Sequence, residues 1–135
     1  FRLSELPGFE GVLLDEMAAG AEVILGSKQD PQFGPVVLIG IGGTSVEIYK
    51  DVSIRMAPLS AVEALQALHA LKGRRLLEGY RGRTPVNTDH LTDLIARFSQ
   101  MVFELADHIE SIDLNPVLCG AEKAVIADAR IMIKR

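Results

Sequence analysis

The sequence predicts an α+β fold in which two groups of strands flank two helices. Short apolar stretches with strand character occupy residues 21–29, 35–41 and 45–55, and two more occupy residues 111–118 and 124–133. Between the two groups, apolar residues recur at steps of three and four, as they do on one face of a helix. Strands, then helices, then strands indicate a layered α+β architecture.

The size and composition of the chain fit one domain. Its 135 residues suffice for a hydrophobic core, and 48% hydrophobic with 24% charged residues is typical of a soluble globular protein. The net charge of -4 argues against a general nucleic-acid or membrane surface. The single cysteine, Cys119, indicates a reducing cytoplasm and is interpreted as a small apolar filler. The start at Phe1, without a signal-peptide pattern, indicates a fragment of a longer chain.

The first strands are joined by turns. The stretch DPQFG (30–34) separates the first two, and its Asp, Pro and Gly are placed as in a tight turn. The second strand, PVVLIGI (35–41), is almost continuously apolar, so we expect both of its faces to be covered. The third, SVEIYKDVSIR (45–55), alternates partly, as a half-buried strand does.

A glycine cluster follows the second strand and contains Gly40, Gly42 and Gly43. A dinucleotide-binding turn needs a third glycine and a following helix, but Ser45 stands at that position and a β-like stretch follows. A Walker loop needs Lys and then Ser or Thr after its last glycine, and neither follows Gly43. We therefore expect a turn between antiparallel strands, with residues 46–48 back in β-structure.

Two helices are predicted in the middle of the chain. Ser60 and Glu63 form a capping box before AVEALQALHALKG, and we expect Gly73 to end that helix. RRLLEGYRG (74–82) is typical of a further helical turn closed by glycines. The second helix begins after Asn87 or Thr88 as its cap. Its apolar stripe comprises Leu91, Leu94, Ile95, Phe98, Met101, Val102 and Leu105.

The last two strands predict a register of pairing, with residues 120–123 as the loop of a hairpin. One apolar face, expected in the core, pairs Ile112 with Ile131, Leu114 with Ala129, Pro116 with Ala127 and Leu118 with Val125. The opposite face pairs Asp113 with Arg130, Asn115 with Asp128 and Val117 with Ile126.

The polar face of this hairpin has two interpretations. An amide oxygen facing a carboxylate, with a second carboxylate nearby, suits Mg²⁺, which prefers oxygen ligands and takes one or two carboxylates together with nucleotide phosphates. The alternative is an ordinary surface salt bridge between Asp113 and Arg130, with Asn115 as a polar surface residue. Spacing alone favours the salt bridge, because charge pairs are common on protein surfaces.

The motifs DPQFGP, LLEGYRG, SIDLNPV and VIADAR, in this order, resemble the ATP-grasp domain of NDP-forming acyl-CoA synthetases. These include the ADP-forming acetyl-CoA synthetases and, more distantly, the succinyl-CoA synthetase β-subunit. The resemblance runs from about Gly11 to Ile133. It implies the C-terminal subdomain of an ATP-grasp module, a largely antiparallel sheet with helices on one face. The earlier subdomain with its phosphate-holding basic residue, the CoA-binding domain and the phosphohistidine domain would lie outside this single domain, 1–135.

The resemblance also implies a function. The chain would be the nucleotide- and magnesium-binding lobe of a ligase that couples the interconversion of acyl-CoA and free acid to ATP or ADP, through acyl phosphate and phosphohistidine. Its partners would be the nucleotide and the CoA-binding and phosphohistidine domains or subunit of an oligomeric, cytoplasmic parent, with no role for nucleic acid or a membrane. The chain alone would be inactive.

Site residues follow from the same resemblance. Asp15, Glu16 and Met17 match the hinge strand that lines the adenine, largely through backbone groups, and Glu22 matches the acid that reaches the ribose hydroxyls. Asp15 departs from the family pattern, in which Gln or Glu is common.

The metal ligands also follow from the resemblance. Asn115 and Asp128 match them, with Asp113 near them, which agrees with the register and reverses the preference for a salt bridge. Retention of these residues favours an enzyme over the alternative, a non-catalytic regulatory module such as the synthetase-like part of a protein lysine acetyltransferase.

Overall fold

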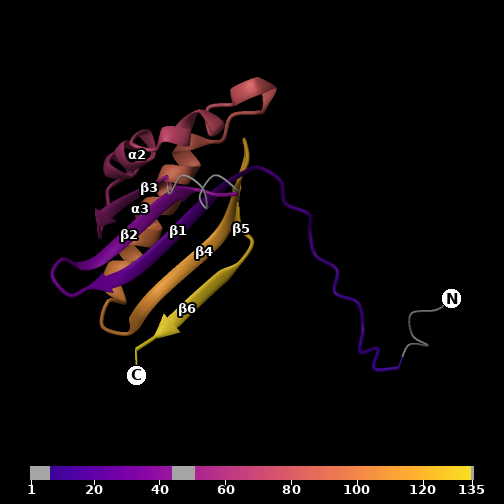
Figure 1. Ribbon diagram of the computed structural model, residues 1–135, viewed down its shortest axis with the longest axis horizontal. Coiled ribbons are helices and arrows are strands. Elements are labelled where there is room, and N and C mark those ends of the chain that lie inside the picture. Colours follow the sequence, from indigo (N-terminus) through magenta and orange to yellow (C-terminus); the bar gives the residue numbers. More distant parts are fainter. Residues whose placement is uncertain (1–6, 44–50, 135) are drawn as a thin grey trace.

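A six-stranded sheet forms the centre of the computed structural model, which describes residues 7–43 and 51–134 (Figure 1). The strand order is β3-β2-β1-β4-β5, and β6 also pairs with β4. All pairings between these described strands are antiparallel. The strands are β1 (Ala21–Asp30), β2 (Gly34–Ile41), β3 (Val52–Met56), β4 (Ile109–Cys119), β5 (Ala124–Ile126) and β6 (Ala129–Ile133). The predicted α+β architecture is confirmed.

Helices of the described part of the chain lie on one face of this sheet (Figure 1). The α-helices are α2 (Ala61–His69) and α3 (Thr88–Glu104), and the 3-10 helices η2 (Lys72–Leu76) and η3 (Tyr80–Gly82) lie between them. We call the side of the sheet that carries α2 and α3 the covered face and the other side the open face. None of the described helices is long and apolar enough to cross a membrane.

Both helix starts are capped as predicted. The Glu63 carboxylate accepts a hydrogen bond from the Ser60 N–H at 2.8 Å, and the Ser60 hydroxyl oxygen accepts one from the Glu63 N–H at 3.3 Å. Asn87 is the cap of α3, because its side-chain oxygen accepts the His90 N–H at 3.0 Å. These bonds satisfy backbone donors that have no partner within the helix itself.

The prediction that Gly73 ends the first helix was wrong. Helix α2 already ends at His69, and Gly73 lies inside η2. The reason is Asp51, a buried carboxylate just before β3, which accepts the Lys72 N–H at 2.8 Å and the Gly73 N–H at 2.7 Å. These bonds hold the segment in a 3-10 conformation, so residues 74–82 contain η2 and η3 rather than a further α-helical turn.

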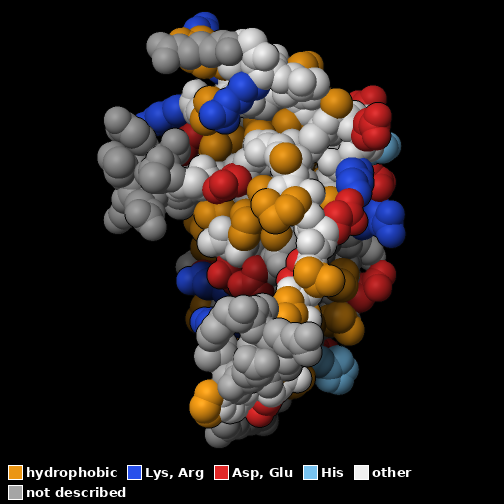
Figure 2. Space-filling view, turned by 90° about the vertical axis from the view of Figure 1, so that its right-hand side faces the viewer, with side chains coloured by type: hydrophobic (Ala, Val, Ile, Leu, Met, Phe, Trp, Pro, Cys, Tyr) orange, Lys and Arg blue, Asp and Glu red, His pale blue; other side chains and the backbone are white. Residues whose placement is uncertain are grey.

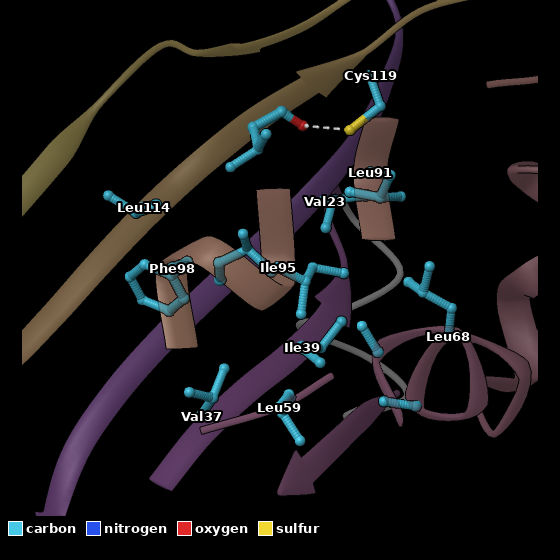
Figure 3. Close-up of a cluster of buried hydrophobic side chains, with 14 of the residues drawn as sticks. Val23, Val37, Ile39, Leu59, Leu68, Leu91, Ile95, Phe98, Leu114 and Cys119 are labelled. Carbon is cyan, nitrogen blue, oxygen red and sulfur yellow. Dashed lines mark hydrogen bonds between the residues drawn. The ribbon is translucent and has the colours of Figure 1, made fainter. Parts of the chain in front are cut away.

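The covered face and the helices enclose one hydrophobic core (Figure 3). Its largest fully buried side chains are Leu25, Ile39, Leu71, Leu91, Ile95, Val23, Val37, Val117 and Ser99. The polar member, Ser99, accepts the Leu59 N–H at 2.8 Å and donates to the Ala96 carbonyl at 2.7 Å. The core therefore contains a hydroxyl that is fully used in hydrogen bonding.

The open face of β2 is less covered than predicted. Val37 and Ile39 are fully buried, whereas Val36 and Leu38 are only partly buried. Together with Ile54 and neighbouring residues they line a hollow of about 310 Å³ on the open face. The expectation that both faces of residues 35–41 are covered was therefore wrong, because the described helices pack on one side of the sheet.

Strand β4 contains a bulge at residues 115–116, which both lie opposite Ile24 of β1. An extra residue reverses the alternation of side chains along a strand. Leu114 and Val117 are therefore both buried, while Leu118 is partly exposed. The predicted pairing register is confirmed on both sides of the bulge. The assignment of Val117 to the polar face and of Leu118 to the core was wrong.

Strand β6 lies at an edge of the sheet and contributes little to the core. Ile131 pairs with Ile112 as predicted, but it is 53% exposed, whereas Ile112 is 2% exposed. The difference arises because β6 pairs with β4 alone, while α3 packs over β2, on the other side of β1. The prediction of a core position therefore holds for Ile112 and Leu114 of β4 and was wrong for their β6 partners, Ile131 and Ala129.

The glycine pair lies where a strand connection was predicted. Gly42 and Gly43 directly follow β2, and the next described strand, β3, returns antiparallel to β2. Gly43 has a φ of +77°, a conformation that favours glycine. The pair thus lies in a connection between antiparallel strands, and residues 44–50 of that connection, including the predicted β-structure at residues 46–48, lie outside the described residues.

Candidate functional site

An extended arm, residues 7–19, leaves the sheet at the start of β1 (Figure 1). Its apolar residues Leu13, Leu14 and Met17 are 84%, 89% and 92% exposed. The surface on this side of the molecule mixes hydrophobic, acidic and basic side chains (Figure 2). One ion pair connects the arm to the rest of the domain, from Glu16 Oε1 to Lys123 Nζ at 3.1 Å.

Two of the three predicted hinge residues, Glu16 and Met17, line a hollow of about 300 Å³ between the arm and the β4–β5 turn. We call it the arm hollow. The turn and the adjoining ends of β4 and β5 contribute Leu118, Gly120, Ala121, Glu122, Lys123 and Val125 to it. Asp15 is exposed and is not among the residues that line this hollow.

Glu22 lines a second and larger hollow of about 730 Å³, at the start of β1. We call it the β1 hollow. It is lined by Ala19, Gly20, Ala21, Glu22, Leu76, Gly82, Arg83, Thr84, Cys119, Gly120 and Ala121. Ala19, Gly120 and Ala121 belong to both hollows, so the two are neighbours that share a border.

Arg83 and Thr84 are lining residues that the sequence did not indicate. Their segment is fixed at its base, because the Asn87 N–H donates to the Gly120 carbonyl at 2.9 Å. Gly79 permits the preceding turn: its φ is +90°, and a β-carbon there would lie 2.7 Å from the Arg83 carbonyl oxygen. The glycines of LLEGYRG were the only sequence signal for this loop, and they do not reveal which hollow it borders.

The third predicted group lies at the bulge of β4. Asn115 lies opposite Asp128, and its backbone N–H donates to the Asp128 carbonyl at 3.2 Å. Both side chains are exposed. One carboxylate oxygen of Asp128 accepts the Ala129 N–H at 2.9 Å. Within the described residues, Asp128 forms no ion pair.

Asp113 lies on the open face two residues before Asn115, where it lines the 310 Å³ hollow. It pairs in register with Arg130, as predicted. The two do not form an ion pair, however, and the described parts of the chain contain such pairs only elsewhere. The salt-bridge interpretation of this face is therefore not what the structure shows.

The residues at the bulge fit magnesium in chemistry and number. Carboxylate and amide oxygens are the donors that Mg²⁺ prefers, and it commonly takes one or two carboxylates, with phosphate and water oxygens in the other positions. Across residues 7–43 and 51–134, no three His, Cys, Asp or Glu side chains cluster closely enough to hold a metal by themselves. A metal held here would thus need oxygens from a ligand.

Cys119 borders the β1 hollow but is not suited to chemistry. It is 2% exposed, and burial raises the pKa of its thiol to about 11. Its Sγ donates to the Val117 carbonyl at 3.7 Å (Figure 3). Because the reactive form of cysteine is the thiolate, this residue serves as the apolar filler that the sequence predicted.

Comparison with known families agrees with the fold. The described fold is an antiparallel sheet with helices on one face, and Glu22 supplies a carboxylate beside one of two adjoining hollows. Residues 3–133 match the model of the ATP-grasp domain, so the chain belongs to this family.

Curated relatives include subunits and full-length ligases. The chain is 42% identical over 124 residues to the β-subunit of acetate–CoA ligase (ADP-forming) I of Pyrococcus furiosus, covering 91% of this chain and 53% of that subunit. It is 43% identical over 110 residues to the 4-hydroxybutyrate–CoA ligase (ADP-forming) of Nitrosopumilus maritimus, covering 81% of this chain and 16% of that ligase. The chain thus spans about half the length of the first relative and less of the second.

A solved structure agrees in fold over most of the chain. It is the dinucleotide forming acetyl-coenzyme A synthetase 1 of Ca. Korarchaeum cryptofilum, in complex with coenzyme A and Mg-AMPPCP. The TM-score is 0.81 and the identity 38%, with 87% of this chain and 55% of that chain covered.

Proposed function

We propose that this chain is the nucleotide- and magnesium-binding lobe of an NDP-forming acyl-CoA synthetase. The observation that carries the proposal is the pairing of Asn115 with Asp128 at an exposed bulge of β4. The proposal includes a longer parent protein, since the chain spans 53% of its Pyrococcus relative. The CoA-binding and phosphohistidine domains would lie elsewhere in that parent, which we expect to be oligomeric and cytoplasmic.

In this proposal the nucleotide, ATP or ADP, occupies the two adjoining hollows. Backbone groups of Glu16 and Met17 contact the base in the arm hollow, with Asp15 next to them in the chain. The Glu22 carboxylate accepts hydrogen bonds from the ribose hydroxyls beside the β1 hollow. The shared border of the two hollows supports this arrangement, because a base and its ribose are adjacent groups of one molecule. The exposed carboxylate of Glu22 is an acceptor suited to hydroxyl donors.

Asn115 and Asp128 would hold the magnesium ion, with Asp113 beside them. When bound, Mg²⁺ neutralises charge on the transferring phosphoryl group. The protein groups orient the ion and leave its remaining positions to phosphate oxygens. Because both side chains are exposed, their replacement should alter ligand binding without opening a cavity in the core.

The acyl group is not determined by the residues of this site. The relatives act, by their names, on acetate and on 4-hydroxybutyrate, although their identity to this chain is nearly the same, 42% and 43%. We therefore place acyl recognition in another part of the parent.

The test is transfer of labelled phosphate from ATP to the parent protein. Asp128→Ala should lower the rate of labelling by about 100-fold or more, as the loss of one group that stabilises transition-state charge does. Asp107→Ala is the matched control, because Asp107 is an exposed carboxylate in the turn between α3 and β4. It should label like the wild type, and circular dichroism should show both variants folded.

Near-normal labelling of a folded Asp128→Ala protein would exclude the metal role. Labelling that is absent from the wild-type parent, under conditions that label a known synthetase, would instead support a regulatory ATP-grasp-like module. The 135-residue chain alone should show no synthetase activity, since it spans only 53% of its Pyrococcus relative.

A further inference from the structure

Gly42 and Gly43, the glycine pair after β2, have no role in the function proposed so far. Their contacts with Glu22 indicate a role. Gly42 is buried, and its N–H donates to the Glu22 carbonyl at 2.6 Å. A β-carbon on Gly42 would lie 2.7 Å from Glu22 Cβ and 3.0 Å from the Glu22 carbonyl carbon. Real β-carbons do not approach other atoms this closely, so only glycine lets the end of β2 lie against Glu22.

Gly43 leaves room for the carboxylate of Glu22. A β-carbon on Gly43 would lie 3.3 Å from Glu22 Oε2 and 3.9 Å from Glu22 Cδ. The Glu22 side chain therefore extends over the bare backbone of Gly43 and at the same time borders the β1 hollow. A methyl group at Gly43 would force the carboxylate, which is the movable end of a flexible side chain, to shift.

We propose that Gly43 is a positioning residue for Glu22: the absence of a side chain allows the carboxylate to lie where it meets a ligand in the β1 hollow. The inference rests on the proposed function, in which Glu22 accepts hydrogen bonds from the ribose. It gives the glycine pair a second purpose besides the turn. The pair supports an acid that binds the sugar.

The chain offers a matched control in Gly34. Gly34 and Gly43 both have a φ of +77°, so alanine is placed in the strained left-handed region at either position. A β-carbon on Gly34 would meet nothing within 4 Å, whereas one on Gly43 would meet the Glu22 carboxylate. Any difference in ligand binding between the two alanine variants therefore reports the contact with Glu22.

The experiment measures the Kd of MgATP and of Mg-2′-deoxyATP for the parent protein by calorimetry. Glu22→Ala should raise the Kd of MgATP about tenfold or more, which is the cost of losing hydrogen bonds to a charged group. Gly43→Ala should raise it about three- to tenfold, because the acceptor is displaced and not deleted. In both variants the preference for ATP over 2′-deoxyATP should fall, and Gly34→Ala should retain wild-type values for both nucleotides.

A double variant separates positioning from a general structural effect. Gly43→Ala should add little to the Kd of Glu22→Ala, because the group on which it acts is already gone. Should Gly43→Ala not fold, Gly43→Asn takes its place, since asparagine tolerates a positive φ.

Three outcomes would overturn the inference. One is a wild-type Kd for a folded Gly43→Ala protein while Glu22→Ala binds weakly, which leaves the proposed function intact. Another is full additivity in the double variant. The third is a wild-type Kd for Glu22→Ala itself, which removes the ribose role of Glu22 from the proposed function and the inference with it.

Discussion

The covered and open faces of the sheet differ in what their residues do, although the same strands form both. Val37 and Ile39 on the covered face are fully buried against the helices. Leu38, between them, faces the 310 Å³ hollow on the open face. Because side chains alternate along a strand, one register decides both sets at once. The contacts that stabilise the fold are therefore concentrated on the covered face. Asp113, proposed to lie beside the metal, and Glu22, proposed to bind the ribose, can be substituted without disturbing the core.

The largest expected difference in the free energy of unfolding is between alanine variants of two neighbouring residues of β2. Ile39→Ala should lower the free energy of unfolding by about 3 to 4 kcal/mol, because it leaves a cavity in a packed core. Leu38→Ala should lower it by less than about 1.5 kcal/mol, because the Leu38 side chain is only partly buried. Urea denaturation of the 135-residue chain measures both. Equal losses would show that the open face is as closely packed as the covered one.

Alanine substitutions of serines on the two faces should differ less in their effect on the free energy of unfolding. Ser99→Ala leaves the buried Leu59 N–H without its 2.8 Å acceptor, so we expect a loss of about 1 to 2 kcal/mol. Ser111→Ala, on the partly exposed open-face side of β4, should change the free energy of unfolding by less than about 0.5 kcal/mol. The same urea titration compares the two, and a larger loss for Ser111 would contradict the assignment of stability to the covered face.

The parts of this fold that depend on local chemistry could be predicted from the sequence. The capping box at Ser60 and Glu63 is a matter of neighbouring residues, as is the cap at Asn87. The register of β4 with β5 and β6 followed from one hairpin and its apolar pattern. In each case the information lies within a short stretch of chain.

Features set by distant partners could not be predicted in this way. The bulge at residues 115–116 exists in the pairing of β4 with β1, and a hairpin pattern contains no information about β1. The end of α2 depends on Asp51, which bonds to backbone groups 21 and 22 residues further along the chain. The alternation beyond the bulge and the position of Gly73 were mispredicted for these reasons.

The candidate site likewise contains residues that the sequence indicated and surroundings that only distant contacts determine. The resemblance to a family indicated Glu16, Met17 and Glu22, but the hollows that they line are formed by the β4–β5 turn and the segment after η3. Arg83 and Thr84 were missed because the bond from Asn87 to Gly120 places them, and no sequence pattern records it. Spacing identified the pair at the β4 bulge, and the resemblance supplied its proposed role.

The smallest effect is expected at Asp30, the last residue of β1, where the turn to β2 begins. The N–H groups of Gln32 and Phe33 donate to Asp30 Oδ1 at 2.9 and 3.0 Å and hold the pKa of this carboxyl below its ordinary value. A carboxyl whose pKa is lower in the folded state than in the unfolded state stabilises the fold at any pH above its unfolded-state pKa, which is about 3.9 for Asp. That contribution is lost as the pH falls through this value towards the pKa of the folded state. Asp30→Asn keeps the acceptor oxygen and removes the titration, so stability should fall less steeply between about pH 4.5 and pH 3 than in the wild type. An unchanged slope in Asp30→Asn would show that the turn does not couple folding to protonation.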